Sequence, residues 1–350
     1  MNYLRNAWYV AAAAAEVVRE PFRRIILEEP IVLYRLESGE PAALFDRCPH
    51  RFAPLSRGRQ IGDDLQCIYH GLRFDKAGVC VLNPHGSKSI PQTARVKSYP
   101  LYEKYGYVWI WPGDPARADP SLIPEFDFLE DKKSFRTVSG YLTIDANYQL
   151  VVDNLLDLSH VEFLHPMFAR KEGVDSHRTE FSQEGNAIYS RRLKSNSSLN
   201  DFARLFWTSP SEKGDGRANM RWTPPSLLYF DLGVTEVGAP VAEGVCTPAA
   251  HLLTPETPYR THYFWSQGRN RKLDDEKLDE ILHNSVHRVF TYEDKPIIEA
   301  QQEEMGEQTD LIAMRPVLLE PDIPGIRARR VLGQLIDEEE QASATPRKSA

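Results

Sequence analysis

Cysteine, basic charge and long apolar runs are all scarce in this chain of 350 residues. Four cysteines are far fewer than a disulfide-rich secreted domain contains, so we expect a reducing, cytoplasmic location. The 42 Lys and Arg residues do not exceed the 50 Asp and Glu residues, as they would in a protein that neutralises a phosphate backbone. No apolar run reaches the ~18 residues of a membrane span, and no clean cleavage site follows the alanine-rich stretch after Arg5. The sequence therefore predicts no nucleic-acid partner, no membrane partner and no secretory signal.

Strand, helix and proline patterns divide the chain into two predicted domains. Residues 1–112 contain short β-type runs between turn residues, which predict a small antiparallel β domain. Four prolines between Pro112 and Pro124 exclude a helix or a central strand, so we place the boundary at residue 112. Residues 113–336 combine strand-like runs with helical periodicity over 145–165 and from Asp275 through Phe290, which predicts an α+β domain. The acidic end, 337–350, is predicted to be a disordered tail.

Two cysteine and histidine pairs form the most specific motif in the chain. Cys48 and His50 make C-x-H, and Cys67 and His70 make C-x-x-H after an interval of 16 residues, 51–66. Two thiolates and two neutral imidazoles are the ligand set of a Rieske [2Fe–2S] cluster. Zinc binds the same atoms, but its sites usually pair cysteine with cysteine and histidine with histidine. Because turn-forming residues adjoin both pairs, we expect them to project from two loops toward one cluster.

A second candidate metal site lies in the segment DNLLDLSHVEFLHP, residues 153–166. Two histidines and one carboxylate can hold an iron ion and leave open coordination positions on it. His160 and His165 are five residues apart, and five residues of an ideal helix turn by ~500°, which leaves the two rings ~140° apart. Pro166 disfavours helical geometry at His165. We therefore expect the helix to break near His165, so that this ring turns back toward His160.

Several of these segments resemble one family. The two Cys and His pairs, the GLRF that follows them and the DNLLDLSHVEFLHP segment resemble the oxygenase components of Rieske non-haem iron oxygenases. The opening RNAWYVAA, the WPGDPARADP junction and the LTPETP and HYFW strands are most similar to the group of vanillate O-demethylase, dicamba O-demethylase and toluenesulfonate methyl-monooxygenase. The resemblance implies an N-terminal antiparallel β Rieske domain and a C-terminal helix-grip-like antiparallel sheet with helices.

The resemblance also implies the ligands of two metal centres. A [2Fe–2S] cluster would be held by Cys48, His50, Cys67 and His70. A mononuclear Fe(II) would be held by His160, His165 and Asp294. Glu293 should face ~100° away from Asp294 on the same helix, and Pro296 is expected to kink or restart that helix.

Two further residues before His160 receive catalytic roles from the resemblance, Asn154 and Asp157. Asp157 lies three residues before His160, on nearly the same helix face. In the family the equivalent aspartate bridges a Rieske histidine of one subunit to an iron-ligating histidine of its neighbour, so the resemblance implies a homotrimer. A solvated helix carboxylate is the alternative. His283 and His287 share a helix face, but they lack a third ligand and are expected to be a surface pair.

The sequence contains no convincing site for NADH. Gly214-Asp215-Gly216 lacks the third glycine of a dinucleotide fingerprint and is expected to lie in a polar loop. The resemblance implies that NADH acts indirectly, through a reductase that carries flavin and a plant-type [2Fe–2S] cluster. Dioxygen would be the cosubstrate.

The implied function is that of the terminal oxygenase of a multicomponent monooxygenase with a small aromatic substrate. We expect O-demethylation of a methoxybenzoate-like compound with release of formaldehyde. N-dealkylation, or ring or methyl hydroxylation of another aromatic xenobiotic, remains open, as do a non-catalytic Rieske electron carrier and a zinc-stabilised binding module. The candidate substrate residues are His251, Asp231 and Phe230. His251 would hydrogen-bond a carboxylate, as its match in dicamba-type enzymes suggests, whereas Asp231 would suit a phenol, an amide or an amine.

Overall fold

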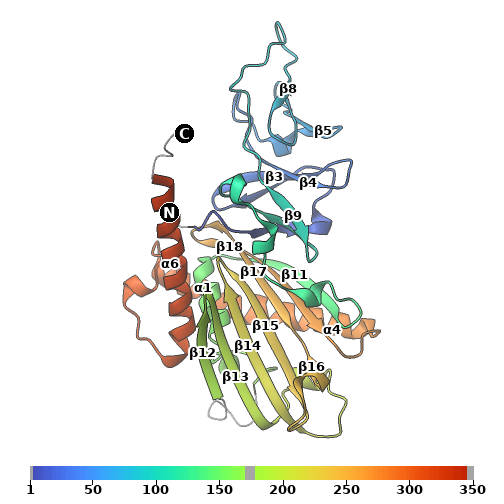
Figure 1. Ribbon diagram of the computed structural model, residues 1–350, viewed down its shortest axis with the longest axis vertical. Coiled ribbons are helices and arrows are strands. Elements are labelled where there is room, and N and C mark those ends of the chain that lie inside the picture. Colours follow the sequence, from blue (N-terminus) through green and yellow to red (C-terminus); the bar gives the residue numbers. More distant parts are fainter. Residues whose placement is uncertain (1–2, 170–177, 345–350) are drawn as a thin grey trace. The chain divides into compact units, whose positions relative to one another are not determined.

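The chain forms two compact units in the computed structural model, which describes residues 3–169 and 178–344 (Figure 1). The N-terminal unit comprises Tyr3–Ile123 and Thr254–Thr257, and the C-terminal unit comprises Pro124–Leu253 and the residues from Pro258 onward. The division falls after Ile123 rather than at the predicted residue 112. The reason is that the proline-rich junction is bonded to the first residues of the chain: Trp8 Nε1 donates to the carbonyl of Asp119 at 2.8 Å, and the Asp114 amide donates to Asn6 at 2.8 Å.

The N-terminal unit consists of three small antiparallel sheets, as the short β-type runs predict. The first sheet has the order β1 (Tyr9–Ala13), β10 (Tyr107–Ile110) and β9 (Leu101–Lys104). The second has the order β2 (Phe22–Ile26), β3 (Glu29–Arg35) and β4 (Pro41–Phe45). The third has the order β5 (Arg59–Ile61), β6 (Asp64–Gln66), β7 (Arg73–Phe74) and β8 (Cys80–Leu82).

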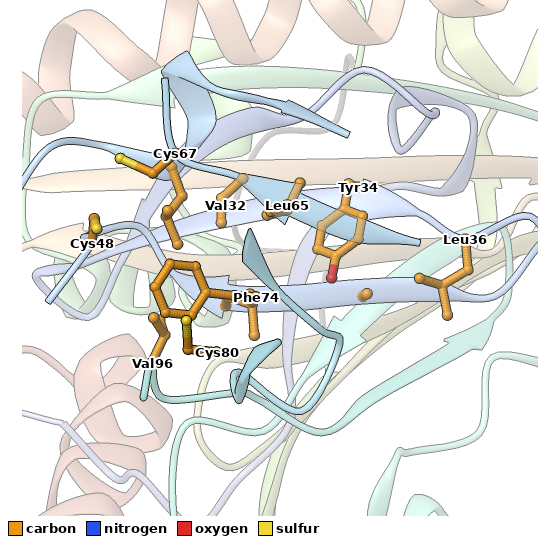
Figure 2. Close-up of a cluster of buried hydrophobic side chains, with 12 residues drawn as sticks. Val32, Tyr34, Leu36, Cys48, Leu65, Cys67, Phe74, Cys80 and Val96 are labelled. Atoms are coloured by element: carbon orange, nitrogen blue, oxygen red, sulfur yellow. The ribbon is translucent and has the colours of Figure 1, made fainter. Parts of the chain in front are cut away.

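A hydrophobic cluster between the second and third sheets supports the two loops that carry Cys48 and Cys67 (Figure 2). Val32, Tyr34, Leu65 and Phe74 are fully buried in it. Cys48 and Cys67 lie at one end of the cluster, so their sulfur atoms are anchored to packed side chains. Cys80 is buried in the same cluster and belongs to the core.

The C-terminal unit is built on an eight-stranded antiparallel sheet with the order β11-β18-β17-β15-β14-β13-β12, and β16 pairs with β15. Its strands are β11 (Arg136–Ile144), β12 (Arg178–Glu184), β13 (Ala187–Ser198), β14 (Lys213–Thr223), β15 (Leu227–Thr235), β16 (Val245–Cys246), β17 (Ala249–Thr257) and β18 (Arg260–Arg269). The predicted α+β class, with antiparallel sheets in both units, is confirmed. Gly214 to Gly216 lie on β14, so the prediction of a polar loop there was wrong.

Six α-helices and one π-helical turn accompany this sheet in the described part of the unit. They are α1 (Tyr148–Leu156), α2 (Val161–Leu164), α3 (Asp201–Arg204), α4 (Glu276–Arg288), the π-helix η8 (Val289–Asp294), α5 (Lys295–Met305) and α6 (Ile323–Ala344). Helix α4 packs on β11 and β18, whereas α1 packs on β14 and on α6 (Figure 1). The helix predicted over 145–165 is therefore two helices with a break between Leu156 and Val161.

Helix α6 extends to Ala344 and corrects the prediction of a disordered tail from residue 337. Ala328, Leu332 and Ile336 form a buried stripe at four-residue steps, and Glu339 is buried three residues further on. Arg329 of α6 makes a bidentate ion pair with Asp153 of α1, with Nη2 2.6 Å from Oδ2. Residues 345–350 lie outside the described part of the chain. In the described ranges, no helix is both long enough and apolar enough to cross a membrane.

Candidate metal centres and substrate cavity

Two loops of equal length carry the predicted cluster ligands. The amide of Phe52 donates to the carbonyl of Cys48, and the amide of Gly71 donates to the carbonyl of Cys67, both at 2.9 Å. Phe52 and Gly71 occupy the same loop position, and both have left-handed backbone angles, φ 61° and φ 74°. Each loop thus buries its cysteine and presents a histidine, His50 or His70, at or near the surface.

The four side chains fit a cluster with two sulfur and two nitrogen ligands. The rings of His50 and His70 lie 4.4 Å apart between centroids. Burial and the neighbouring Cys67 thiol raise the pKa of Cys48 to about 11, so two thiolates side by side need cationic metal to offset their charge. His85 Nε2 lies 2.8 Å from the carbonyl of His70, and this contact stabilises the conformation of the second loop.

In the C-terminal unit, His160, His165 and Asp294 converge on one point. His160 Nε2 is 3.2 Å from His165 Nε2, and Oδ1 of Asp294 is 3.5 Å from the first nitrogen and 3.2 Å from the second. Ligand atoms about 2.1 Å from one ion, at angles of about 90–110°, lie about 3.0–3.4 Å apart. The three donor atoms therefore have the spacing of a facial triad, and all three could reach a single metal ion.

Hydrogen bonds on the far side of each ring explain why the three donors face one another. Nδ1 of His160 pairs with the carbonyl of Asp157, and Nδ1 of His165 lies 2.8 Å from Glu293 Oε2. Both acceptors require a proton on Nδ1, which leaves the Nε2 lone pairs directed at each other and at Asp294. Two lone pairs and a carboxylate at this distance repel unless a cation lies between them.

The pKa values of Asp294 and His165 are shifted because these side chains lie close together. Burial alone would raise the pKa of Asp294, but the adjacent His160 and His165 rings lower it to about 2. Burial would lower the pKa of His165, but Asp294 and Glu293 raise it above its usual value. Asn154 Nδ2 donates to Asp294 Oδ1 at 3.1 Å, so this predicted catalytic residue orients the carboxylate.

This geometry is possible because the helical segment is interrupted before His160 and again at His165. Helix α1 ends at Leu156 and Asp157 caps it, so the break precedes His160 instead of lying only at His165 as predicted. The carboxylate of Asp157 accepts the Ser159 amide at 2.7 Å, and His165 then leaves helical geometry before Pro166, with φ −117° and ψ 87°.

Glu293 departs from the prediction that it faces away from Asp294. The π-helical turn η8 covers both residues, and its wider turn directs both carboxylates to His165. Pro296 stands in the first turn of α5, directly after η8, where its missing amide proton is tolerated. His283 and His287 stack with ring centroids 5.9 Å apart, and neither belongs to a group of three potential ligands in the described chain.

A cavity adjoins the triad, and its walls are largely apolar. Leu155, Leu158, Phe168, Met220, Val286 and Phe290 are among its lining side chains. Phe230 and His251, two of the predicted substrate residues, also line it. Asp231 does not: it alternates with Phe230 on β15 and pairs with Arg217 at 2.8 Å, on the side of the strand away from Phe230.

His251 lines this cavity and has a buried polar atom without a partner in the described part of the chain. Burial lowers the pKa of His251 to about 3, so the ring is neutral. Its Nδ1 lies 2.7 Å from the hydroxyl of Tyr263, whose pKa burial raises well above the usual value, so the hydroxyl can donate to Nδ1. The proton then resides on Nε2, which is buried and has no hydrogen-bond partner among the described residues.

Sequence reasoning missed four charged residues of the cavity wall, one of which is Arg217, the partner of Asp231. Arg192 and Lys194 are buried inward-facing residues of β13, and Lys194 Nζ lies 3.5 Å from Glu162 of α2. The signal was present in the sequence, since basic residues two apart on a strand share a face. The fourth, Glu162, follows His160 by two residues.

Comparisons with known proteins match both units. The Rieske [2Fe-2S] domain matches residues 7–100, and the vanillate O-demethylase oxygenase C-terminal domain matches residues 144–338. The oxygenase component of dicamba O-demethylase from Stenotrophomonas maltophilia is 37% identical over 335 residues, which cover 96% of this chain and 98% of that protein.

Two further proteins extend the comparison. The oxygenase component of chloroacetanilide N-alkylformylase from Rhizorhabdus wittichii is 35% identical, over 94% of each chain. A crystal structure of dicamba monooxygenase with non-heme iron and dicamba is 35% identical and matches with a TM-score of 0.84, covering 98% of this chain and 100% of that one. With these matches, the resemblance inferred from the motifs is confirmed, and a zinc module or a lone electron carrier is excluded. The chain belongs to the Rieske non-haem iron oxygenases and is an oxygenase component of a multicomponent monooxygenase that works with a reductase, a [2Fe–2S] cluster and a mononuclear iron.

Proposed function

We propose that this oxygenase removes the methyl group of a methoxybenzoate-like compound and releases formaldehyde and a phenol. The observation that carries the proposal is the cavity that joins the His160, His165 and Asp294 group to the buried, unpartnered Nε2 of His251. One end of that cavity would hold the reacting carbon and the other a polar substituent of the ring. We also propose that Cys48, His50, Cys67 and His70 hold the cluster and that His160, His165 and Asp294 hold the iron.

His251 is proposed to anchor the substrate. Its Nε2 proton would donate to a carboxylate or phenol oxygen, and binding would satisfy a polar atom that is otherwise buried without a partner. Three cationic side chains line the same cavity, Arg192, Lys194 and Arg217, against two acidic ones, Glu162 and Asp294. This excess favours an anionic ring substituent. Asp231 is not proposed again, because Arg217 occupies its carboxylate.

The chain's own contribution to the reaction is to position the methyl carbon and exclude water. When bound, the mononuclear iron supplies the activation of dioxygen with electrons from the cluster. The apolar walls formed by Leu158, Phe230 and Phe290 favour an aromatic ring and bring its nearest C–H bonds to the triad. A methoxy carbon hydroxylated there becomes a hemiacetal, which collapses without further catalysis.

The partner and the assembly are proposed from family resemblance. The reductase would carry flavin and a plant-type [2Fe–2S] cluster, and three copies of the oxygenase would form a ring in which Asp157 connects the cluster of one copy to the iron of the next. Because NADH must supply the electrons, we propose that the system works in the cytoplasm.

Given a methoxybenzoate, the oxygenase with reductase and NADH is expected to release formaldehyde in proportion to the phenol formed. A panel of methoxybenzoates, methyl aromatics and N-methyl arylamines, scored for formaldehyde, phenol and diol, tests this. Uncoupled turnover, in which oxygen is consumed without product formation, serves as the baseline. Ring diols as the sole products would refute demethylation, and formaldehyde from the amines alone would assign the chain to N-demethylation.

A further inference from the structure

Two adjacent carboxylates reach the two nitrogens of one imidazole. Asp294 Oδ1 lies 3.2 Å from Nε2 of His165, and Glu293 Oε2 lies 2.8 Å from Nδ1 of the same ring. Consecutive side chains on a regular α-helix diverge by ~100°, so they would not flank one ring. The π-helical turn η8 brings them together, and such turns occur often at functional sites.

We infer that Glu293 is the positioning residue of His165 and that it raises the affinity of the triad for the mononuclear iron. The inference rests on the proposed iron ligands. By accepting the Nδ1 proton, Glu293 fixes the tautomer in which Nε2 has a free lone pair, and it holds the ring plane so that this lone pair faces Asp294 and His160. A carboxylate on Nδ1 also makes Nε2 a stronger donor to a cation.

The two histidines of the triad are held by different kinds of acceptor. His160 donates to the neutral backbone carbonyl of Asp157, whereas His165 donates to a carboxylate. The side chain of His165 is only 5% exposed and that of Glu293 is 21% exposed, so solvent competes little for this hydrogen bond. A charge-assisted bond in such a site is about twice as strong as a neutral one. Glu293 therefore contributes to iron binding although it does not touch the iron.

The test measures iron binding instead of turnover. Full-length oxygenase, depleted of its mononuclear iron by a chelator, is equilibrated with Fe(II) under anaerobic conditions. Bound iron is then counted, and the EPR signal of its nitric oxide adduct is recorded. We compare Glu293→Leu, which removes the acceptor, with Glu293→Gln, which keeps an acceptor of nearly the same shape without the charge. The control is Glu304→Gln, an exposed carboxylate of α5.

Glu293→Leu is expected to bind Fe(II) about 10–100-fold more weakly than the parent, with the cluster spectrum unchanged. The affinity of Glu293→Gln for Fe(II) should lie between those of the parent and Glu293→Leu, and its EPR line shape should differ from that of the parent. Glu304→Gln should match the parent in both measurements. If Glu293→Leu does not fold, the Glu293→Gln measurement decides alone. Parental affinity and line shape in the Glu293 variants would overturn the inference, as would an equal loss in Glu304→Gln. A His165→Ala variant distinguishes failure of this inference from failure of the proposed function. If that variant binds Fe(II) as tightly as the parent, the proposed iron ligands are wrong, and not merely the role of Glu293.

Discussion

Replacing His160 by alanine is expected to abolish turnover and leave the visible spectrum of the [2Fe–2S] cluster unchanged. His160 Nε2 is one of three donor atoms within 3.5 Å of one another, and its loss leaves one nitrogen and one carboxylate to hold the iron. All four proposed cluster ligands belong to the N-terminal unit, whereas His160 belongs to the C-terminal unit. Iron analysis and steady-state oxygen uptake of the purified variant measure the two effects separately.

The matched control for that variant is His283→Ala. His283 is a partly buried histidine of the same unit that stacks on His287 and lies outside the triad. It should keep both its iron content and its turnover. Loss of the cluster spectrum in a folded His160→Ala protein would show that this histidine serves the other metal centre.

Asp157→Asn is expected to keep both metals and to slow electron transfer from cluster to iron by about 10–100-fold, the range typical of residues that connect to metal ligands. Asparagine retains an acceptor for the Ser159 amide, which Asp157 binds at 2.7 Å, and it leaves unchanged the backbone carbonyl that holds His160. Only the negative charge is lost. Rapid-mixing measurement of cluster reoxidation by oxygen and substrate gives the rate.

The oligomeric state must be measured beside that rate, because the proposed bridge connects two subunits. Light scattering should give a trimer for both the parent and the variant. A slow rate in a dissociated variant would reflect loss of assembly. An unchanged rate in an intact trimer would mean that Asp157 caps helix α1 and takes no part in electron transfer.

Sequence reasoning predicts most where short spacings between potential ligands restrict the chain. The Cys48 and His50 pair and the Cys67 and His70 pair specify loops and donors together, because short ligand spacings leave the chain few conformations. His160 and His165 lie five residues apart and could be paired from the sequence, whereas only the family resemblance added Asp294, which is distant in the chain. In the structure, the donor atoms of these three residues lie within 3.5 Å of one another.

The failures have a common physical origin in tertiary packing. The direction of Glu293 depends on a π-helical turn between α4 and α5, which the periodicity of a regular α-helix does not predict. Asp231 was judged by residue type, but strand alternation places it opposite Phe230, where Arg217 binds it. The run Glu338 to Glu340 suggested a solvated tail, although the apolar steps at Leu332 and Ile336 already carried the period of a helix.

Metal analysis of the purified oxygenase, combined with its visible and EPR spectra, tests the central claim most directly. The donor set of four side chains in one unit and three in the other predicts a red-brown protein with about three irons per chain, two in a Rieske-type cluster and one mononuclear. His160→Ala should lower the count by the mononuclear iron alone. A colourless protein with stoichiometric zinc, or a Rieske signal without a further iron, would contradict the account.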